Sequence, residues 1–202
     1  TIAKRDYRIG FLATALLSIG GYMMMPFGSA FSINNLRVPQ EQLPILFMVA
    51  GVSSLLVMPA VGKLSDKVDK MVIFTIATLW MSVVVLFYTH LAATPLWIVL
   101  IFNVVMMMGM MSRVIPASAL TTAIPEMQDR GAFMSINSSL QQVAGGIAAV
   151  FAGMIVVQKT KSSPLEHYDY LGYIVISISI LCIFTVYRVS TVLKRKLAEK
   201  TL

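Results

Sequence analysis

The sequence predicts an all-α, polytopic membrane protein in which six transmembrane helices form one bundle. Hydrophobic residues make up 57% of the chain and charged residues 12%, about half the charged share of a soluble domain, which is roughly 25%. The apolar residues fall into long runs without charge instead of recurring at a period of two or 3.6. Lipid is therefore the expected solvent.

The lengths of these runs give the six elements. A helix needs about 20 largely apolar residues to cross a hydrocarbon core of about 30 Å. We predict spans at roughly 9–35, 43–62, 71–91, 96–122, 132–158 and 169–191, all within a single domain over residues 1–202. The loops between them are short, so consecutive spans should pack as antiparallel neighbours.

The first two spans carry a proline each, and so does the fourth. These are Pro26, Pro59 near the end of the second span, and Pro116. Proline removes a backbone donor and tends to kink a helix, which is tolerated where neighbours or a cavity satisfy the freed carbonyl. Each of the three can equally be a kink without functional meaning.

The fourth span contains Arg113, whereas the apolar runs at 9–36, 43–61, 71–94, 132–158 and 170–187 contain no Asp, Glu, Lys or Arg. A charge at membrane depth costs several kcal/mol and is a functional hypothesis by default. Arg113 lies nearer the cytoplasmic end of its helix, so its side chain can face a cavity or snorkel to the inner headgroups. None of these runs offers a carboxylate to neutralise it, so an acid would have to come from a missing half, from lipid or from an anionic substrate.

The fifth span carries a row of small residues, and the sixth span carries a single cysteine. Gly145, Ala149 and Gly153 recur every four residues, which predicts a helix-packing face where backbones approach closely. Cys182, in the sixth span, has no partner in the chain, so an intrachain disulfide is excluded. The 15 methionines are more typical of lipid-facing or adaptable packing than of a metal site, and we expect no metal and no cofactor.

The basic residues set the orientation, because cytoplasmic loops retain Lys and Arg. Both termini are predicted to be cytoplasmic, in a multi-pass protein of the plasma membrane. A nucleic-acid partner is not expected from the +7 charge, since the basic residues are spread over four segments without an aromatic platform. Twelve of the 16 basic residues would then be cytoplasmic: Lys4, Arg5, Arg8, Lys63, Lys67, Lys70, Arg130, Arg188, Lys194, Arg195, Lys196 and Lys200.

The turn between the second and third spans is the most specific local signal. By charge alone residues 62–70 are a solvated turn in which Asp66 could receive a helix N-terminus or a basic partner. The segment also resembles the Gly-x-Leu-x-Asp-(Arg/Lys)-x-Gly-(Arg/Lys) signature of the major facilitator superfamily, with Asp69 in the usual glycine position. The matching residues are Gly62, Leu64, Asp66, Lys67 and Lys70.

The turn before the fifth span is similar to the same family, in the pair Arg130-Gly131 and the glycine-lined helix that follows. Val105 stands where the amino-terminal half of family members usually carries Arg, and Ile147-Ala148 follow the paired glycines where antiporters carry Gly-Pro. The resemblance therefore implies a carboxy-terminal half. A start at Thr1 and the basic ends agree with one half of a longer gene product.

The resemblance also implies candidate sites. In the family the first, second, fourth and fifth helices of this half face a central cavity, and the turns described above act in gating. The candidate substrate-cavity residues are Tyr22, Asn103, Arg113, Asn137 and Gln141, and the candidate gating residues are Gly62, Asp66, Lys67, Lys70, Arg130 and Gly131.

The implied function is transport of a small solute by alternating access, as in a proton-coupled antiporter for efflux of a drug or small metabolite. The coupling acid and second wall would come from a missing amino-terminal half, although a second copy of the chain could also cover the open face. A Met-rich cavity favours an amphipathic solute and Arg113 an organic anion, and the sequence does not decide between them. The alternative is a non-transporting membrane scaffold or a partner-binding bundle. An enzyme is not expected, because Glu166-His167 stands alone and no serine has a nucleophile setting.

Overall fold

Six helices long and apolar enough to span a membrane make up the fold, as the sequence predicts. The structure, a computed structural model, describes residues 4–201. In these residues the only strand-like pairing is an isolated bridge between Val157 and Glu166. The α-helices are α1 (Arg5–Tyr22), α2 (Gly28–Asn34), α3 (Leu43–Lys67), α4 (Lys70–Thr89), α5 (Leu96–Thr122), α6 (Arg130–Ile155) and α7 (Tyr168–Thr201), with 3-10 turns η1 (Met25–Phe27), η2 (Gln40–Gln42) and η3 (Met127–Asp129).

The first span is broken where the sequence places Pro26. Helix α1 ends at Tyr22, η1 contains Pro26, and α2 continues the span. Proline has no N–H to donate to the preceding turn, and Phe27 donates instead to the carbonyl of Met24 at 3.2 Å. Pro59 and Pro116, in contrast, lie inside uninterrupted helices α3 and α5, so only one of the three prolines breaks its helix.

The last two spans differ in length from the prediction. Helix α6 ends at Ile155, because Val157 pairs with Glu166 in the following loop. Helix α7 continues to Thr201, well past the predicted end near residue 191. Hydropathy marks only the part of a helix that lies in lipid, and the polar extension of α7 is held by contacts at the bundle end.

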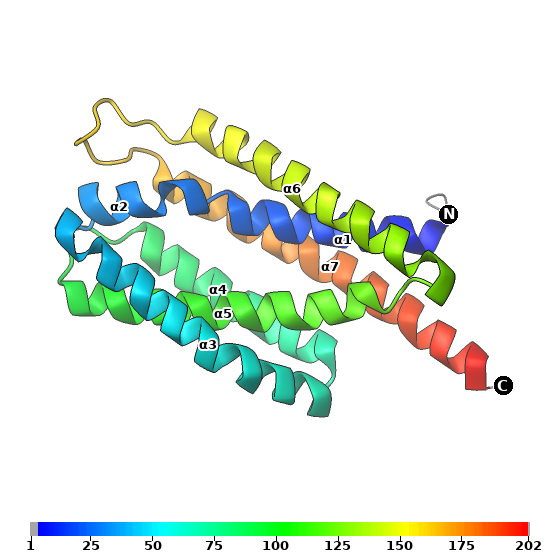
Figure 1. Cartoon of the computed structure of the whole chain (residues 1–202). Coiled ribbons are helices and arrows are strands. Elements are labelled where there is room, and N and C mark those ends of the chain that lie inside the picture. The colour runs from blue at the N-terminus through cyan, green and yellow to red at the C-terminus, as the bar shows by residue number, and fades with distance from the viewer. Residues whose placement is uncertain (1–3, 202) are drawn as a thin grey trace.

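The helices pack in a pattern that occurs twice. Helix α1 lies against α6 and α7, α5 lies against α3 and α4, and α4 against α7 joins the two groups (Figure 1). The same contacts result when α1, α3 and α4 are exchanged with α5, α6 and α7. Because the first and fourth spans run in opposite directions, the bundle is an inverted repeat of three helices, a design found in secondary transporters.

Two apolar clusters occupy the two ends of the bundle. We call the end where α1 begins and α7 finishes the termini end, and the opposite end, where α7 begins, the far end (Figure 1). The termini-end cluster includes Tyr7, Phe74 and Phe133. The far-end cluster includes Phe31 and Tyr168, whose rings stack 4.2 Å apart. Polar side chains at mid-depth therefore lie between two packed ends.

The outer faces of the bundle are apolar. Leu55 and Leu56 of α3 are 75% and 70% exposed, and Met154 of α6 is 73% exposed. Such surfaces would be costly in water but not in hydrocarbon, where helices satisfy their own backbone groups. The exposure of these side chains agrees with a multi-pass membrane protein.

Candidate functional site

A cavity of about 410 Å³ lies between helices α1, α2, α3, α4, α5 and α7. This size is within the range of small-molecule sites, about 300–1,000 Å³. Its wall is mostly apolar and includes seven methionines: Met24, Met25, Met81, Met106, Met107, Met110 and Met111. Methionine is unbranched and polarizable, so this wall can adapt to ligands of different shape.

Arg113 lines this cavity from α5 and is only 7% exposed. One terminal nitrogen of its guanidinium donates to the Ser179 Oγ of α7 at 3.1 Å. Its Nε is buried and has no hydrogen-bond partner. Among the side chains that the structure describes, no carboxylate pairs with Arg113. Of the two alternatives for Arg113, the structure has the cavity-facing one.

Asn103 is the second predicted residue that lines the cavity. Its side-chain Oδ1 is buried and has no hydrogen-bond partner. Asn103 precedes Arg113 on the same helix, so it lies nearer the far end, by about 15 Å at 1.5 Å per residue. Two residues of α5 that carry incompletely satisfied polar groups therefore line one apolar space at different depths.

Three of the five predicted cavity residues lie elsewhere. No residue of α6 lines this cavity, so Asn137 and Gln141 lie outside it. Tyr22 packs between α1 and α6, since a Cβ added at Gly145 would approach its ring to 3.0 Å. The Oδ1 of Asn137 is also buried without a partner, but on a different side of the bundle's core.

Ser179 and the α4 side chains Met81 and Ser82 are cavity residues that sequence reasoning missed. They come from the third and sixth spans, which the family resemblance did not place at the cavity. Serine in a membrane helix usually bonds its own backbone, so Ser179 carries no signal of its own. Its role depends on which helix faces α5.

The packing face of α6 is shifted from the predicted one. Ala144, Gly145, Ala148 and Ala152 are buried, whereas Gly153 is exposed and a Cβ added there would meet no other atom within 4 Å. Of the predicted stripe, Gly145 makes the close contact and Ala149 is half-buried. The packing face begins one residue earlier than predicted, because the residues of α6 that pack against α1 recur at helical spacing from Ala144.

The predicted gating turn is mostly helix. Helix α3 extends through Lys67, so Gly62, Asp66 and Lys67 belong to its last turns. Asp66 and Lys67 are exposed, and Asp66 has no hydrogen-bond or ion-pair partner among the described residues. Lys70 donates to the Ser65 carbonyl at 3.1 Å. Among the described residues Asp66 receives neither a helix N-terminus nor a basic partner, so that expectation stays a prediction.

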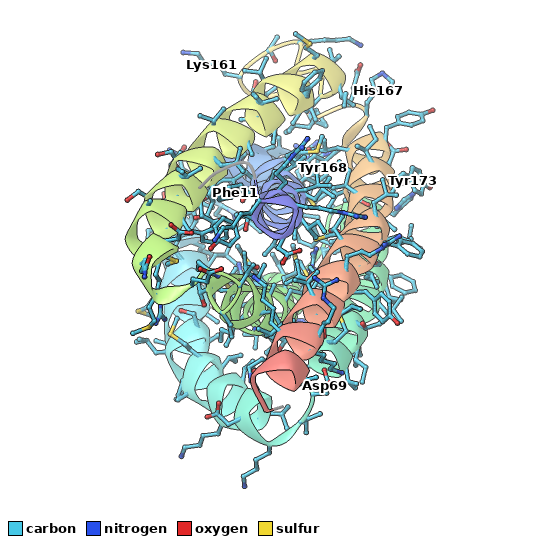
Figure 2. All side chains as sticks on the ribbon, turned by 90° about the vertical axis from the view of Figure 1, so that its right-hand side faces the viewer. Phe11, Asp69, Lys161, His167, Tyr168 and Tyr173 are labelled. Atoms are coloured by element: carbon cyan, nitrogen blue, oxygen red, sulfur yellow. The ribbon has the colours of Figure 1, made fainter. Side chains whose placement is uncertain are left out.

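Asp69 has the two roles that were expected of Asp66. It caps α4 by accepting from the Met71 N–H at 2.8 Å, and it accepts from Lys194 Nζ of α7 at 2.8 Å. Figure 2, which looks along the bundle from the termini end, shows Asp69 beside the last part of α7. The Lys194 hydrogen bond, with the Met71 N–H, holds the pKa of Asp69 below its usual range. Aspartate is a favoured N-cap, which the motif resemblance does not show.

The turn before α6 is held by α1. The Tyr7 hydroxyl donates to Asp129 Oδ2 at 2.9 Å and accepts from the Glu126 N–H at 3.2 Å. Lys4 Nζ pairs with Glu126 at 3.0 Å and with Asp129 at 3.3 Å, and these carboxylates raise the pKa of Lys4. Arg130 and Gly131 begin α6, are exposed, and make none of these bonds.

The extension of α7 reaches the same region. Lys196 Nζ donates to the Ile124 carbonyl at 3.2 Å and lies 3.3 Å from Asp6 Oδ2. Two residues earlier in the helix, Lys194 holds Asp69. One segment of α7 thus joins both three-helix groups at the termini end.

Comparison with known proteins agrees with this arrangement. The family model described as Major Facilitator Superfamily matches residues 10–201. No curated protein matches the sequence.

Proposed function

Because this chain belongs to the major facilitator superfamily, whose members are membrane transporters, we propose that it moves a small solute by alternating access around the cavity that Arg113 lines. The single observation that carries the proposal is the buried Arg113 guanidinium, which has no carboxylate partner among the described side chains and lines a ligand-sized space. A charge in this position is costly unless it serves a pathway or a ligand. The described geometry supports a solute site better than a packing role.

We place this chain in the carboxy-terminal half of its transporter. Alternating access needs two bundles that rock about a midplane site, and six helices supply one wall. The apolar outer faces of α3 and α6 would be covered by an amino-terminal half. A second copy of the chain is the alternative occupant of that face.

The direction of transport is proposed to be export of a drug or small metabolite in exchange for protons. None of the residues that line the described cavity is acidic, so a proton-carrying carboxylate would lie in the other half. Asp66 and the other predicted residues at the termini end would take part in gating. The termini end would be cytoplasmic, because it collects most of the basic residues.

Flux measurements test this function. The complete gene product, reconstituted in proteoliposomes with an imposed proton gradient, should move a tracer solute, and Arg113→Ala should reduce the rate at least about tenfold if the guanidinium contacts the solute. The matched control is Arg188→Ala, which removes an exposed cation of α7 outside the cavity. Absence of flux for every solute tested, with the protein folded, would favour the scaffold alternative.

A further inference from the structure

We propose that the cavity binds a small amphipathic organic anion, with Arg113 contacting the carboxylate or sulfonate head and the methionine wall contacting the apolar body. This inference rests on the proposed function, since it names the class of solute for the same cavity. It also decides between the two solute classes that the composition of the chain leaves open.

The charge of Arg113 is the first step. The side chain is 7% exposed, and its described hydrogen-bond partner is the neutral Ser179 hydroxyl. A buried cation without a counterion is strongly unfavourable. Because the residues lining the cavity include no carboxylate, the missing negative charge is best supplied by a ligand.

The free donors of Arg113 are the second step. A guanidinium has five N–H groups in a fixed fork, and the described contacts use one of its terminal nitrogens, leaving Nε unpaired. Ser179 is itself buried, at 2% exposed, so its contact fixes one side of the fork. A guanidinium with unused N–H groups can bind two oxygens of a carboxylate or sulfonate at once, which is the preferred geometry of arginine.

The packing beyond Arg113 is the third step. One to two turns further along α5, Ala117 and Leu120 belong to the termini-end apolar cluster, together with Phe74 and Val186. This cluster lies between Arg113 and the termini-end headgroup region, so the guanidinium cannot readily reach lipid phosphates there. The opening available to an anion is the cavity itself.

The side chains of the cavity wall determine what kind of body the ligand has beyond its anionic head. Seven methionines and several aliphatic side chains surround the space, so a small hydrated anion such as chloride would leave most of the wall unsatisfied. An aromatic or branched aliphatic body would fill it. Asn103, which lines the cavity nearer the far end, suits a hydroxyl or amide group on that body.

Matched ligands test the charge preference directly. The full 202-residue chain in nanodiscs of neutral phosphatidylcholine would be studied by equilibrium dialysis with naphthalene-2-sulfonate, naphthalene-2-methanol and 2-naphthyl-trimethylammonium. We expect the sulfonate to bind at least about tenfold more tightly than the other two, as for a charge-assisted bond. Equal binding of the three ligands, or no binding of the sulfonate, would overturn the proposal without any variant.

Two variants assign the preference to Arg113. Arg113→Gln should abolish it, whereas Arg113→Lys, which keeps the charge but loses the fork, should retain a weaker preference. The control Arg188→Gln removes the same charge from the exposed surface of α7 and should leave binding unchanged. A sulfonate preference that survives Arg113→Gln, or that Arg188→Gln removes equally, would overturn the assignment.

The headgroup of an anionic lipid is the other source of a negative charge for Arg113. Nanodiscs that contain phosphatidylglycerol should bind the sulfonate as tightly as neutral ones if the site takes a solute. Loss of binding only in phosphatidylglycerol would assign the site to a lipid headgroup and overturn the solute proposal. The two proposals can be contradicted independently. Binding of the sulfonate without any flux contradicts the proposed transport. Flux of a neutral solute that Arg113→Gln leaves unchanged contradicts the proposed anion site.

Discussion

The bond between Arg113 and Ser179 joins two helices that line the cavity. It joins α5 to α7 between the two apolar clusters, and it leaves the buried Nε of the guanidinium without a hydrogen-bond partner. A serine that makes such a contact differs from its neighbour Ser177, whose hydroxyl donates to the Tyr173 carbonyl of its own helix at 2.9 Å. The pair offers a direct comparison.

Ser179→Ala should weaken naphthalene-2-sulfonate binding several-fold. Loss of one hydrogen bond to a charged group costs about 1.5–3 kcal/mol at most, and part of that returns when the guanidinium turns to the ligand. The matched control Ser177→Ala should change nothing. Dialysis in nanodiscs measures both, and an equal effect of the two substitutions would contradict the positioning role of Ser179.

Asp69 gives a pH-dependent prediction at the termini end. Its pKa is depressed in the folded protein by Lys194 and the Met71 N–H, from an ordinary value of 3.8. A depressed carboxyl pKa adds stability above the unfolded pKa, and that stability is lost as pH falls through the folded pKa. Asp69→Asn should lower stability at pH 7 by about 0.5 kcal/mol, a small effect because the pair is half-exposed.

Thermal unfolding in detergent at neutral pH and near pH 3 measures this effect. The difference between wild type and Asp69→Asn should shrink at the acidic pH. Asp66→Asn is the control, because Asp66 has no described partner and its loss should not change the unfolding temperature. A constant difference at both pH values would show that the charge pair does not contribute.

Asp66 itself belongs to the proposed gate. In the complete transporter Asp66→Asn should reduce flux while stability and expression stay near wild type, since the exposed carboxylate has no structural contact within the described chain to lose. The expected reduction is about tenfold, as for loss of one charged contact in a moving interface. Unchanged kinetics would leave residues 62–70 a solvated helix end.

At the scale of elements, hydropathy predicted the number and the rough position of the six helices. It did not predict which side of each helix packs against its neighbours. The stripe at Gly145, Ala149 and Gly153 has helical spacing, yet the buried row begins at Ala144. Several neighbouring rows of α6 are rich in small residues, so spacing alone cannot select the one that meets α1. Only the partner, here the ring of Tyr22, fixes the rotation of the helix.

Two glycine substitutions in α6 test that facing. Gly145→Ala would bring a methyl group to 3.0 Å from the Tyr22 ring and should destabilise the chain by about 1 kcal/mol or more through overpacking. Gly153→Ala has open space and should be neutral or slightly stabilising, because alanine favours helix. SDS-induced unfolding measures both, and Tyr22→Ala should relieve the cost of Gly145→Ala. Equal effects would contradict the described packing.

At the scale of the molecule, sequence predicted the membrane class, the span count and the family, because each depends on local composition or a local motif. The cavity depended on which helices are neighbours. Ser179 and Asn103 lie far apart in the chain, and only the packing of α7 near α5 places them around one space. Asp69 and Lys194 were likewise identified only once the fold had brought them together.

Topology is the whole-molecule prediction. Both termini and the α3–α4 turn should be cytoplasmic, from the distribution of basic residues. In a Cys182-free background, a single cysteine at Lys67 should react with a membrane-impermeant maleimide only from the cytoplasmic side, and one at Lys161 only from outside. Labelling of Lys67 from outside would reverse the orientation of the bundle.

The extension of α7 has a practical consequence for following the protein in motion. Lys194 and Lys196 connect this helix to Asp69, Asp6 and the Ile124 carbonyl, so the termini end should move as one body. Spin labels at Lys67 and Gln128 would then keep a fixed separation through a turnover cycle. That pair can serve as a fixed reference. A change in the distance from it to a label on any other segment would then measure the displacement of that segment.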